Sequence, residues 1–427
     1  MEREPSSRRR LLVLGSITLA AGCLGLQLWR YPLDDSAPFG GDSWEYQSLG
    51  VNLAKGLGYR FGGLAPLADY RFKPDGHAPG SPQVFAEPDR FQVSHFYRTP
   101  GYPLFLALVY SVAGVHPLVV KLLQALMSAL ACAALPWISS GYWGRRGLLS
   151  GAAAALVFAA TLCPDPTQIM AESLLLFSLL AWSICFAAWE RRGGGRLLVG
   201  LGALTGWALL VKGWLVFLPP LVVVAIALHR GTPGRARVLG AALFLGALVA
   251  SVLPWSLYAS SRAGQVVVLS TQGEVALLDT NNEDSIASGR WEPKFRMEPR
   301  DPAYFYNRPE VRDLGPLQKV ASFWAAHAGQ LPRAMWNKLA AAFDSILLAL
   351  VVLLMACAYL AWGLTRTLAP PVFPLLLLVD WLLLALIFFS SERYSLPFVC
   401  FFLIPAAHAP VAVVEAIRAR RSGLPSA

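Results

Sequence analysis

Long apolar segments recur along the whole chain, and polar stretches separate them. Ten such segments lie at about 11–29, 118–138, 147–162, 170–189, 197–212, 214–228, 238–258, 340–362, 371–390 and 394–416. A helix needs about 20 mostly apolar residues to cross a bilayer. The pattern therefore predicts an all-α, polytopic membrane protein with about ten transmembrane helices.

Two long polar inserts, 30–102 and 259–339, interrupt this pattern. A brief apolar run at about 103–114 is too short to cross and is expected to form a helix at the interface. We therefore divide the chain into a transmembrane module at 1–262 that includes the loop 30–102, a loop at 263–339, and C-terminal transmembrane helices at 340–427.

Composition supports the membrane assignment and excludes other classes of protein. Of 427 residues, 56% are hydrophobic and 15% are charged, which is too much apolar surface for one soluble core. The first apolar segment follows Arg8–Arg10 and has no convincing cleavage site, so we expect a retained span. The six cysteines form no CxxC pair, which indicates neither a disulfide framework nor a zinc site.

The net charge of +10 is explained by topology, so we expect no nucleic-acid partner. Lys and Arg form short clusters between apolar segments, and all the compact clusters fall on one side of the predicted membrane. By the positive-inside rule that side is cytoplasmic. Both long inserts then face outward, and we expect a multi-pass protein of the cell (inner) membrane whose active site also faces outward.

The best catalytic candidate is Asp42, at the start of a predicted helix that follows the first span. A carboxylate that faces a cleft at the membrane can act as a general base for an acceptor hydroxyl. Asp42 and Glu45 also fit a capping box, in which both carboxylates bind free backbone N–H groups. Both interpretations remain open from the sequence.

Three further acids lie in or next to apolar segments. Glu172 is at the outer mouth of the fourth span, where an acid needs a partner or a water-filled cavity, although it also suits the first turn of a helix. Asp165, between two prolines, lies nearby. Asp380 lies in the middle of a span, and the sequence identifies no partner for it.

Four cations fall at or near the predicted outer ends of apolar segments: Arg98, Lys212, Arg262 and Arg393. If they converge, they are suited to hold a phosphate at the membrane surface, together with Tyr394. Each cation alone also suits an interface anchor, and Tyr394 and Trp255 suit an aromatic belt.

A divalent metal site is a further option. The first insert holds His77, His95, Asp69, Asp75, Glu87 and Asp89, whose spacing matches no ligand motif, so we interpret them as solvated loop residues. Asp42 and Glu172 remain candidate metal ligands, and no cofactor is predicted with certainty.

The chain resembles the polytopic GT-C glycosyltransferases in its first outer loop, at Asp42, Tyr46, Leu53–Ala54, Gly56, Gly58–Tyr59 and Arg98–Pro103. It is most similar to the dolichyl-phosphate-mannose protein mannosyltransferase-like group and to the lipid A aminoarabinose transferases. The likeness continues at Ala171–Leu174, Lys212, Pro254–Trp255 and Glu392–Tyr394. The family often has two adjacent acids where Ser43 follows Asp42 here, which leaves a metal requirement open.

This resemblance implies an enzyme that takes a sugar from a polyprenyl-phosphate-linked donor, with inversion, on the outer side of the membrane. The acceptor would be a hydroxyl of a lipid, glycan or protein. The resemblance makes Asp42 the general base and Glu172 a second acid near the donor or a metal, and it places Arg98, Lys212 and Arg393 near the lipid phosphate. The loop 263–339 is the expected acceptor side, because it differs from the family's sequences in a region where acceptor specificity is expected to vary.

Two other classes of function remain. A carrier or flippase of lipid-linked sugars also needs an apolar groove with a cationic headgroup site, but it predicts polar residues near the midplane and two broken, symmetry-related helices. A non-catalytic scaffold that displays the second loop gives Asp42 and Arg98 no role.

Overall fold

A computed structural model of the chain describes residues 6–39, 41–61, 72–74, 95–229, 233–290, 304–365, 370–388 and 392–421. These residues are mostly helical. The exception is a pair of three-residue strands, β1 (Ala37–Phe39) and β2 (Phe72–Pro74), which run in parallel. The predicted all-α, polytopic membrane architecture is confirmed.

Six helices in the described part of the chain are long and apolar enough to cross a membrane: α1 (Ser6–Arg30), α4 (Pro117–Val157, continued by the π-helix η4 at Phe158–Leu162), α5 (Glu172–Arg192), α8 (Gly234–Ala263), α14 (Ile346–Thr365) and α16 (Glu392–Arg421). Four shorter apolar helices accompany them: α3 (Gly101–Ala113), α6 (Gly195–Val211), α7 (Leu218–Leu228) and α15 (Phe373–Ile387).

The long element α4 consists of two arms that fold back on each other. Its backbone leaves the helical conformation at Trp143 and Gly144, where Gly144 has φ +58°. A Cβ on Gly147 would lie 2.1 Å from the carbonyl oxygen of Ser139, so the second arm packs directly on the first. The two arms are the spans predicted at 118–138 and 147–162.

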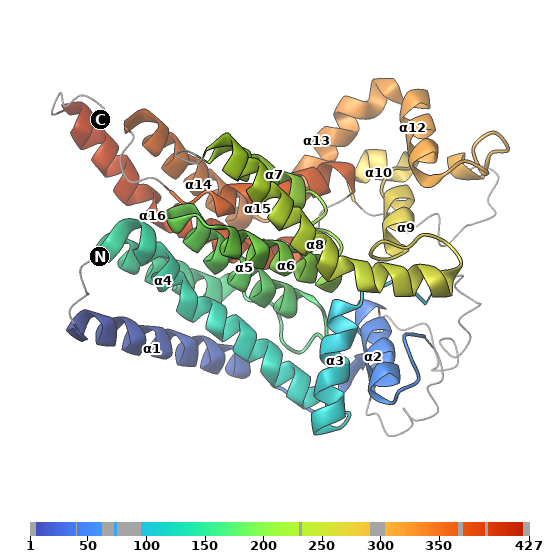
Figure 1. Cartoon of the computed structure of the whole chain (residues 1–427), viewed down its shortest axis with the longest axis horizontal. Coiled ribbons are helices and arrows are strands. Elements are labelled where there is room, and N and C mark those ends of the chain that lie inside the picture. Colours follow the sequence, from blue (N-terminus) through green and yellow to red (C-terminus); the bar gives the residue numbers. More distant parts are fainter. Residues whose placement is uncertain are drawn as a thin grey trace.

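The apolar helices form one bundle around a continuous core. In Figure 1, α1, α4, α5, α6 and α16 run along the long axis of the molecule. Buried Trp182, Phe186, Phe373 and Phe401 belong to the same core cluster, which joins the middle of the chain to its C-terminal helices. The helix predicted over 340–362 starts later than expected. A short non-helical segment separates α13, which ends at Ala342, from α14, which begins at Ile346.

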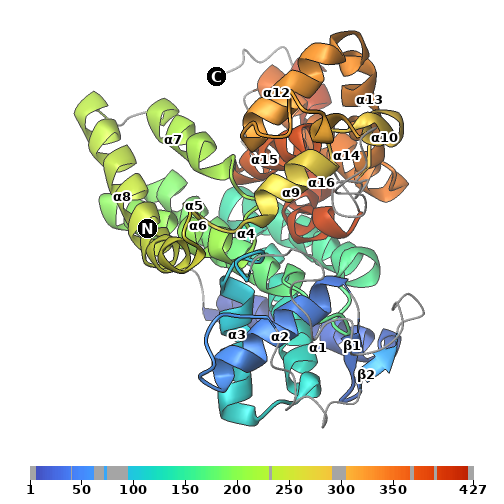
Figure 2. The ribbon, with the colours of Figure 1, turned by 90° about the vertical axis from the view of Figure 1, so that its right-hand side faces the viewer.

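Both polar inserts lie at one end of this bundle (Figures 1 and 2). The first contains α2 (Gly41–Ala54), which packs on α3. The second forms a module of short helices with its own core around Leu278, Tyr306 and Phe323. We call it the outer module; its elements are α9 (Gln272–Asp279), α10 (Glu283–Ser288), η5 (Phe305–Asn307), α12 (Pro316–Ala326), η6 (Ala328–Gln330) and α13 (Leu331–Ala342).

Candidate functional site

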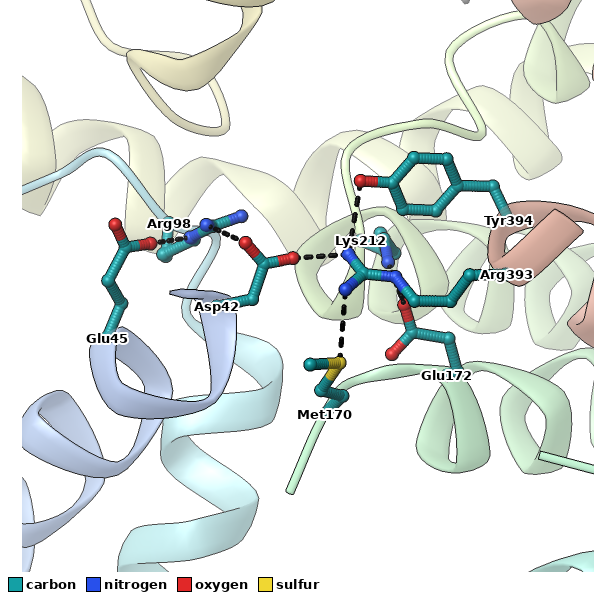
Figure 3. Close-up of polar contacts among 8 residues, drawn as sticks. All are labelled: Asp42, Glu45, Arg98, Met170, Glu172, Lys212, Arg393 and Tyr394. Atoms are coloured by element: carbon teal, nitrogen blue, oxygen red, sulfur yellow. Dashed lines mark hydrogen bonds and ion pairs between the residues drawn. The ribbon is translucent and has the colours of Figure 1, made fainter. Parts of the chain in front are cut away.

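Six charged residues from five distant parts of the chain meet at the end of the bundle that carries the inserts (Figure 3). We call this group the ion cluster; it consists of Asp42 and Glu45 of α2, Arg98 before α3, Glu172 of α5, Lys212 after α6, and Arg393 of α16. Each side chain therefore comes from a helix end or from the residues beside one.

Asp42 lies between two guanidinium groups. Arg98 donates to its Oδ1 and Arg393 donates to its Oδ2. Arg98 also donates through Nε to Oε2 of Glu45. The Arg98 side chain is 5% exposed, whereas Asp42 keeps 21% of its side chain accessible. Asp42 is thus the more open member of a tightly held pair.

A second pair lies beside the first and shares Arg393 with it. Lys212 donates to Oε1 of Glu172 at 2.6 Å, and the Nε of Arg393 is 3.1 Å from the same oxygen. The other oxygen of Glu172, Oε2, is buried and has no hydrogen-bond partner among the described residues. Arg393 therefore bridges the two carboxylates, Asp42 and Glu172.

The motif Arg98–Pro103 brings the first insert against α6. Thr99 donates its hydroxyl to the carbonyl of Val211 at 3.0 Å, and a Cβ on Gly101 would lie 2.6 Å from the backbone N of Val211. Only glycine permits this approach, because any side chain would collide with backbone. The contact holds Arg98 close to Lys212, the residue that follows Val211.

Two aromatic rings cover Lys212. Its ammonium nitrogen is 4.8 Å from the ring centroid of Trp214 and 4.8 Å from that of Tyr394. The two ring centroids are 3.6 Å apart at an interplanar angle of 70°. Cation–π attraction strengthens in such a partly desolvated setting, so the rings help to fix the lysine. Arg393 also donates to the Tyr394 hydroxyl at 3.1 Å.

The charges of the ion cluster balance, with three cations (Arg98, Lys212, Arg393) against three carboxylates (Asp42, Glu45, Glu172). Burial raises the pKa of Asp42, but Arg98, Arg393 and Lys212 together outweigh it and hold that pKa well below its usual range. Asp42 is therefore ionised at neutral pH.

The structure brings together Asp42, Glu172, Arg98, Lys212, Arg393 and Tyr394 as the sequence predicts, but it does not bring Arg262 to them. Arg262 is exposed in the last turn of α8, and none of the ion pairs found among the described residues involves it. Its predicted place beside the other cations is wrong. Trp255 of α8 packs on Tyr59 of the first insert, with ring centroids 4.7 Å apart.

Asp380 has a partner that the sequence did not identify. Its Oδ1 accepts the backbone N–H of Phe217 at 3.1 Å, at the start of α7, and the side chain is fully buried. The acid thereby satisfies a backbone N–H group that the start of the helix would otherwise leave free. This explains the acid in structural terms, away from the ion cluster. Asp165 likewise accepts the backbone N–H of Thr167 at 2.8 Å.

The described residues do not form a metal site. Among them, no three His, Cys, Asp or Glu side chains gather in an arrangement that could hold a metal ion. Both oxygens of Asp42 and one of Glu172 already bind cationic side chains, and His95 accepts a hydrogen bond from the backbone of Phe61. The other candidate ligands, His77, Asp69, Asp75, Glu87 and Asp89, lie outside the described residues.

Sequence reasoning did not assign two residues, Glu45 and Trp214, to the site. Glu45 suited a helix cap, whereas the structure pairs it with Arg98. Trp214 follows the break between two short spans, and the structure places its ring against Lys212 and Tyr394. The available signal was the position of both residues within three places of Asp42 or Lys212.

Comparisons with known proteins show what the chain resembles. Residues 97–257 match the family model of dolichyl-phosphate-mannose-protein mannosyltransferase. The crystal structure of ArnT from Cupriavidus metallidurans bound to undecaprenyl phosphate matches with a TM-score of 0.51 at 14% identity, over 97% of this chain. The chain has the fold of ArnT. It spans 63% of the length of that protein.

The resemblance to the GT-C group is thus confirmed by the family match over residues 97–257 and by the ArnT fold over 97% of the chain. The family match begins one residue before Arg98 and includes Glu172 and Lys212. Asp42 and Arg393 lie outside the matched residues, and no curated protein matches the sequence.

Proposed function

We propose that the chain is a membrane glycosyltransferase that moves a sugar from a polyprenyl-phosphate-linked donor to an acceptor hydroxyl, with inversion. The observation that carries the proposal is the position of Asp42, a partly open carboxylate between two guanidinium groups and next to the Lys212–Glu172 pair. A reaction that expels a phosphate from a sugar needs both a base and fixed cations. The ion cluster supplies both within one site.

The cations act on the leaving group. As the bond between the sugar carbon and the phosphate oxygen breaks, negative charge gathers on the phosphate. Arg393 and Lys212 then stabilise that charge, with Arg98 beside them. Lys212 is 8% exposed and Arg393 is 35% exposed, so Arg393 is the more accessible cation for an incoming phosphate.

Asp42 acts on the acceptor. The acceptor oxygen bonds to the sugar carbon from the face opposite the phosphate, and Asp42 takes the hydroxyl proton. In the chain without donor, Arg98 and Arg393 hold the pKa of Asp42 low, which makes it a weak base. A phosphate that recruits Arg393 removes one of these partners, so donor binding makes Asp42 more basic.

Glu172 positions the cations. It holds Lys212 at 2.6 Å and Arg393 at 3.1 Å through one oxygen, and it is itself 7% exposed. Without this carboxylate, two cations would face each other in a poorly hydrated place. We therefore assign Glu172 a positioning role, and since the residues described do not fit a metal, no step is routed through one.

A carrier of lipid-linked sugars is the alternative, and the placement of charge favours the enzyme. The six residues of the ion cluster lie at or near helix ends, at the end of the bundle that carries both inserts (Figures 1 and 3). A carrier needs its binding site near the midplane, where both sides can reach it in turn.

One experiment separates the two functions. Purified protein in lipid vesicles is given a polyprenyl-phosphate sugar with a radiolabel in the sugar, together with mixed lipid, glycan and protein acceptors. We expect label to leave the donor and to appear in an acceptor. Movement of intact donor across the vesicle membrane, without bond cleavage, would establish the carrier instead.

The proposed site faces outward in the inner membrane of a cell, with both termini cytoplasmic. This orientation follows from the basic clusters between spans. Reporter fusions after Gly193 and after Ser288 should lie in opposite compartments. The same compartment for both would contradict this topology and the proposed outward site.

A further inference from the structure

A pocket of about 480 Å³ lies beside the ion cluster, between the start of the outer module, the residues before α7 and the end of α15. Its wall includes Gly213 and Trp214, which directly follow Lys212. Another part of the wall, Thr271, donates its backbone N–H to the carbonyl of Phe96 at 2.9 Å, two residues before Arg98. The pocket is thus joined to two segments that carry cations of the site.

The pocket combines apolar walls with neutral polar groups. Its apolar side chains include Trp214, Leu384 and Phe388, and its polar side chains are Gln265, Ser270, Thr271, Gln272 and Glu274. Among the described residues that line it, Glu274 is the one charged side chain, and none is Lys, Arg or His. The ion cluster and the pocket therefore differ sharply in chemistry although they adjoin.

We propose that this pocket binds the acceptor and that the acceptor is a neutral glycolipid, an apolar chain that carries sugar hydroxyls. This inference rests on the proposed glycosyltransferase function. Hydroxyl and amide side chains recognise hydroxyl groups, and the carboxylate of Glu274 both accepts from them and repels an anionic headgroup. A phosphorylated acceptor would find no cation within the described wall.

The apolar part of the wall explains why the acceptor is a lipid. Val266 is 86% exposed and Val268 is 60% exposed, and both line the pocket next to the end of α8. Leu384 and Phe388 belong to the last turn and the end of α15. The mouth is therefore apolar where transmembrane helices end, a place suited to a chain that enters from the bilayer.

The isoprenoid chain of the donor fits the pocket less well. Such a chain has no hydrogen-bonding atoms, and its insertion would remove five polar side chains from water without giving them partners. A sugar headgroup replaces those lost hydrogen bonds. The donor phosphate, in turn, belongs with the cations of the ion cluster.

Gly273 allows the pocket to be filled by mutation. It lines the pocket, and a Cβ at this position meets no atom within 4 Å, so the first atom of a Trp side chain fits without a backbone collision. Gly329 is a matched control, because its Cβ also meets nothing within 4 Å and it lies in the outer module away from the pocket wall.

The test measures saturable binding of two labelled probes, octyl β-glucoside and polyprenyl phosphate, to full-length protein in bilayer discs. We expect Gly273→Trp to weaken octyl glucoside binding by roughly tenfold or more, a loss of about 1.4 kcal/mol, and to leave polyprenyl phosphate binding unchanged. Gly329→Trp should leave both affinities at the wild-type level.

Three results would overturn the inference. Equal octyl glucoside binding by Gly273→Trp and the wild type would remove the acceptor from this pocket. Loss of polyprenyl phosphate binding alone in Gly273→Trp would assign the pocket to the donor, and the proposed function would survive. No saturable octyl glucoside binding by the wild type would refute a neutral glycolipid acceptor, whereas absence of polyprenyl phosphate binding would count against the proposed function itself.

The charge of Glu274 gives a second, independent measurement. Glu274→Lys should let octyl phosphate bind while octyl glucoside binding falls, because the carboxylate that repels anions is replaced by a cation. Glu310→Lys, an exposed position in the outer module, is the control with the same change in charge. Equal octyl phosphate binding by both variants would contradict the role given to Glu274.

Discussion

The ion cluster and the buried centre of the outer module both gather polar side chains, yet they are built in opposite ways. In the ion cluster, formal charges oppose each other, and Asp42 and Arg393 stay 21% and 35% exposed. In the outer module the hub is a neutral amide, Asn281, which is 2% exposed. Its side chain donates to the carbonyl of Ile387 and accepts from Trp324 and Lys338.

The difference separates a site for chemistry from a structural joint. Opposed charges that remain partly accessible can exchange a protein partner for a charged ligand. Asn281 is a buried neutral amide that cannot do so, and its hydrogen bonds fix geometry instead. Asn281 and Lys338 both bind the carbonyl of Ile387, at 3.0 and 3.3 Å, and thereby fasten the outer module to the end of α15. Asn281 and Asn282, predicted to lie on the acceptor side, are buried in this joint.

The largest effect is expected from Asp42→Asn. Loss of a general base typically reduces a rate by about 10²–10⁴-fold, and we expect a loss in sugar transfer of this size. The variant should also unfold at a lower temperature, because Arg98 and Arg393 lose a charged partner, so transfer is compared on folded protein. Asp313→Asn, a highly exposed position, is the matched control. Near-normal transfer by Asp42→Asn would remove Asp42 from the mechanism.

Asn281→Leu tests the other region. The substitution removes three hydrogen bonds, and it leaves the Trp324 indole N–H without its partner while Lys338 and the carbonyl of Ile387 still bind each other. An unpaired buried group costs about 1–3 kcal/mol, so the unfolding free energy should fall by roughly that amount. Gln330→Leu, exposed in the same module, is the control. If folded Asn281→Leu protein were as stable as the wild type, the outer module would not depend on this hub.

Lys212→Ala and Arg393→Ala should weaken donor binding by roughly 1.5–3 kcal/mol, the range for a hydrogen bond to a charged group. Arg262→Ala is the matched control and should change donor affinity by less than about 0.5 kcal/mol, because Arg262 lies exposed outside the cluster. Calorimetric titration with the donor measures all three. Equal losses in all three variants would mean that these cations act only as surface charges.

The smallest expected effect is a pH dependence of stability from Lys338. Burial lowers the pKa of Lys338 to about 7, whereas the unfolded chain keeps the ordinary value near 10.4. Between these values the unfolded chain binds more protons, so the Lys338 contribution makes stability rise with pH, by on the order of 1 kcal/mol per pH unit. Denaturant unfolding from pH 6.5 to 9 should show a flatter profile for Lys338→Met, and parallel profiles would contradict the assignment.

The sequence predicted the long spans because length and apolarity decide whether a helix can cross a bilayer. Three helices that it also counted as spans, α6, α7 and α15, are shorter than that length. It also placed most cations and acids of the ion cluster at helix ends. It did not reveal that Glu45 binds Arg98 or that Asp380 binds the N–H of Phe217, because these partners are 53 and 163 residues away. Arg262 was misplaced because the direction of a side chain depends on how its helix is rotated, which apolar length does not determine.

We propose that the cations of the ion cluster bind the phosphate of a lipid donor and that Asp42 competes with this phosphate for them. The most direct test is the affinity of Asp42→Asn for polyprenyl phosphate without a sugar, measured in bilayer discs beside the wild type. Because Arg98 and Arg393 lose a charged partner, the variant should bind polyprenyl phosphate more tightly than the wild type, although it no longer transfers sugar. Unchanged or weaker binding by the variant would contradict the claim.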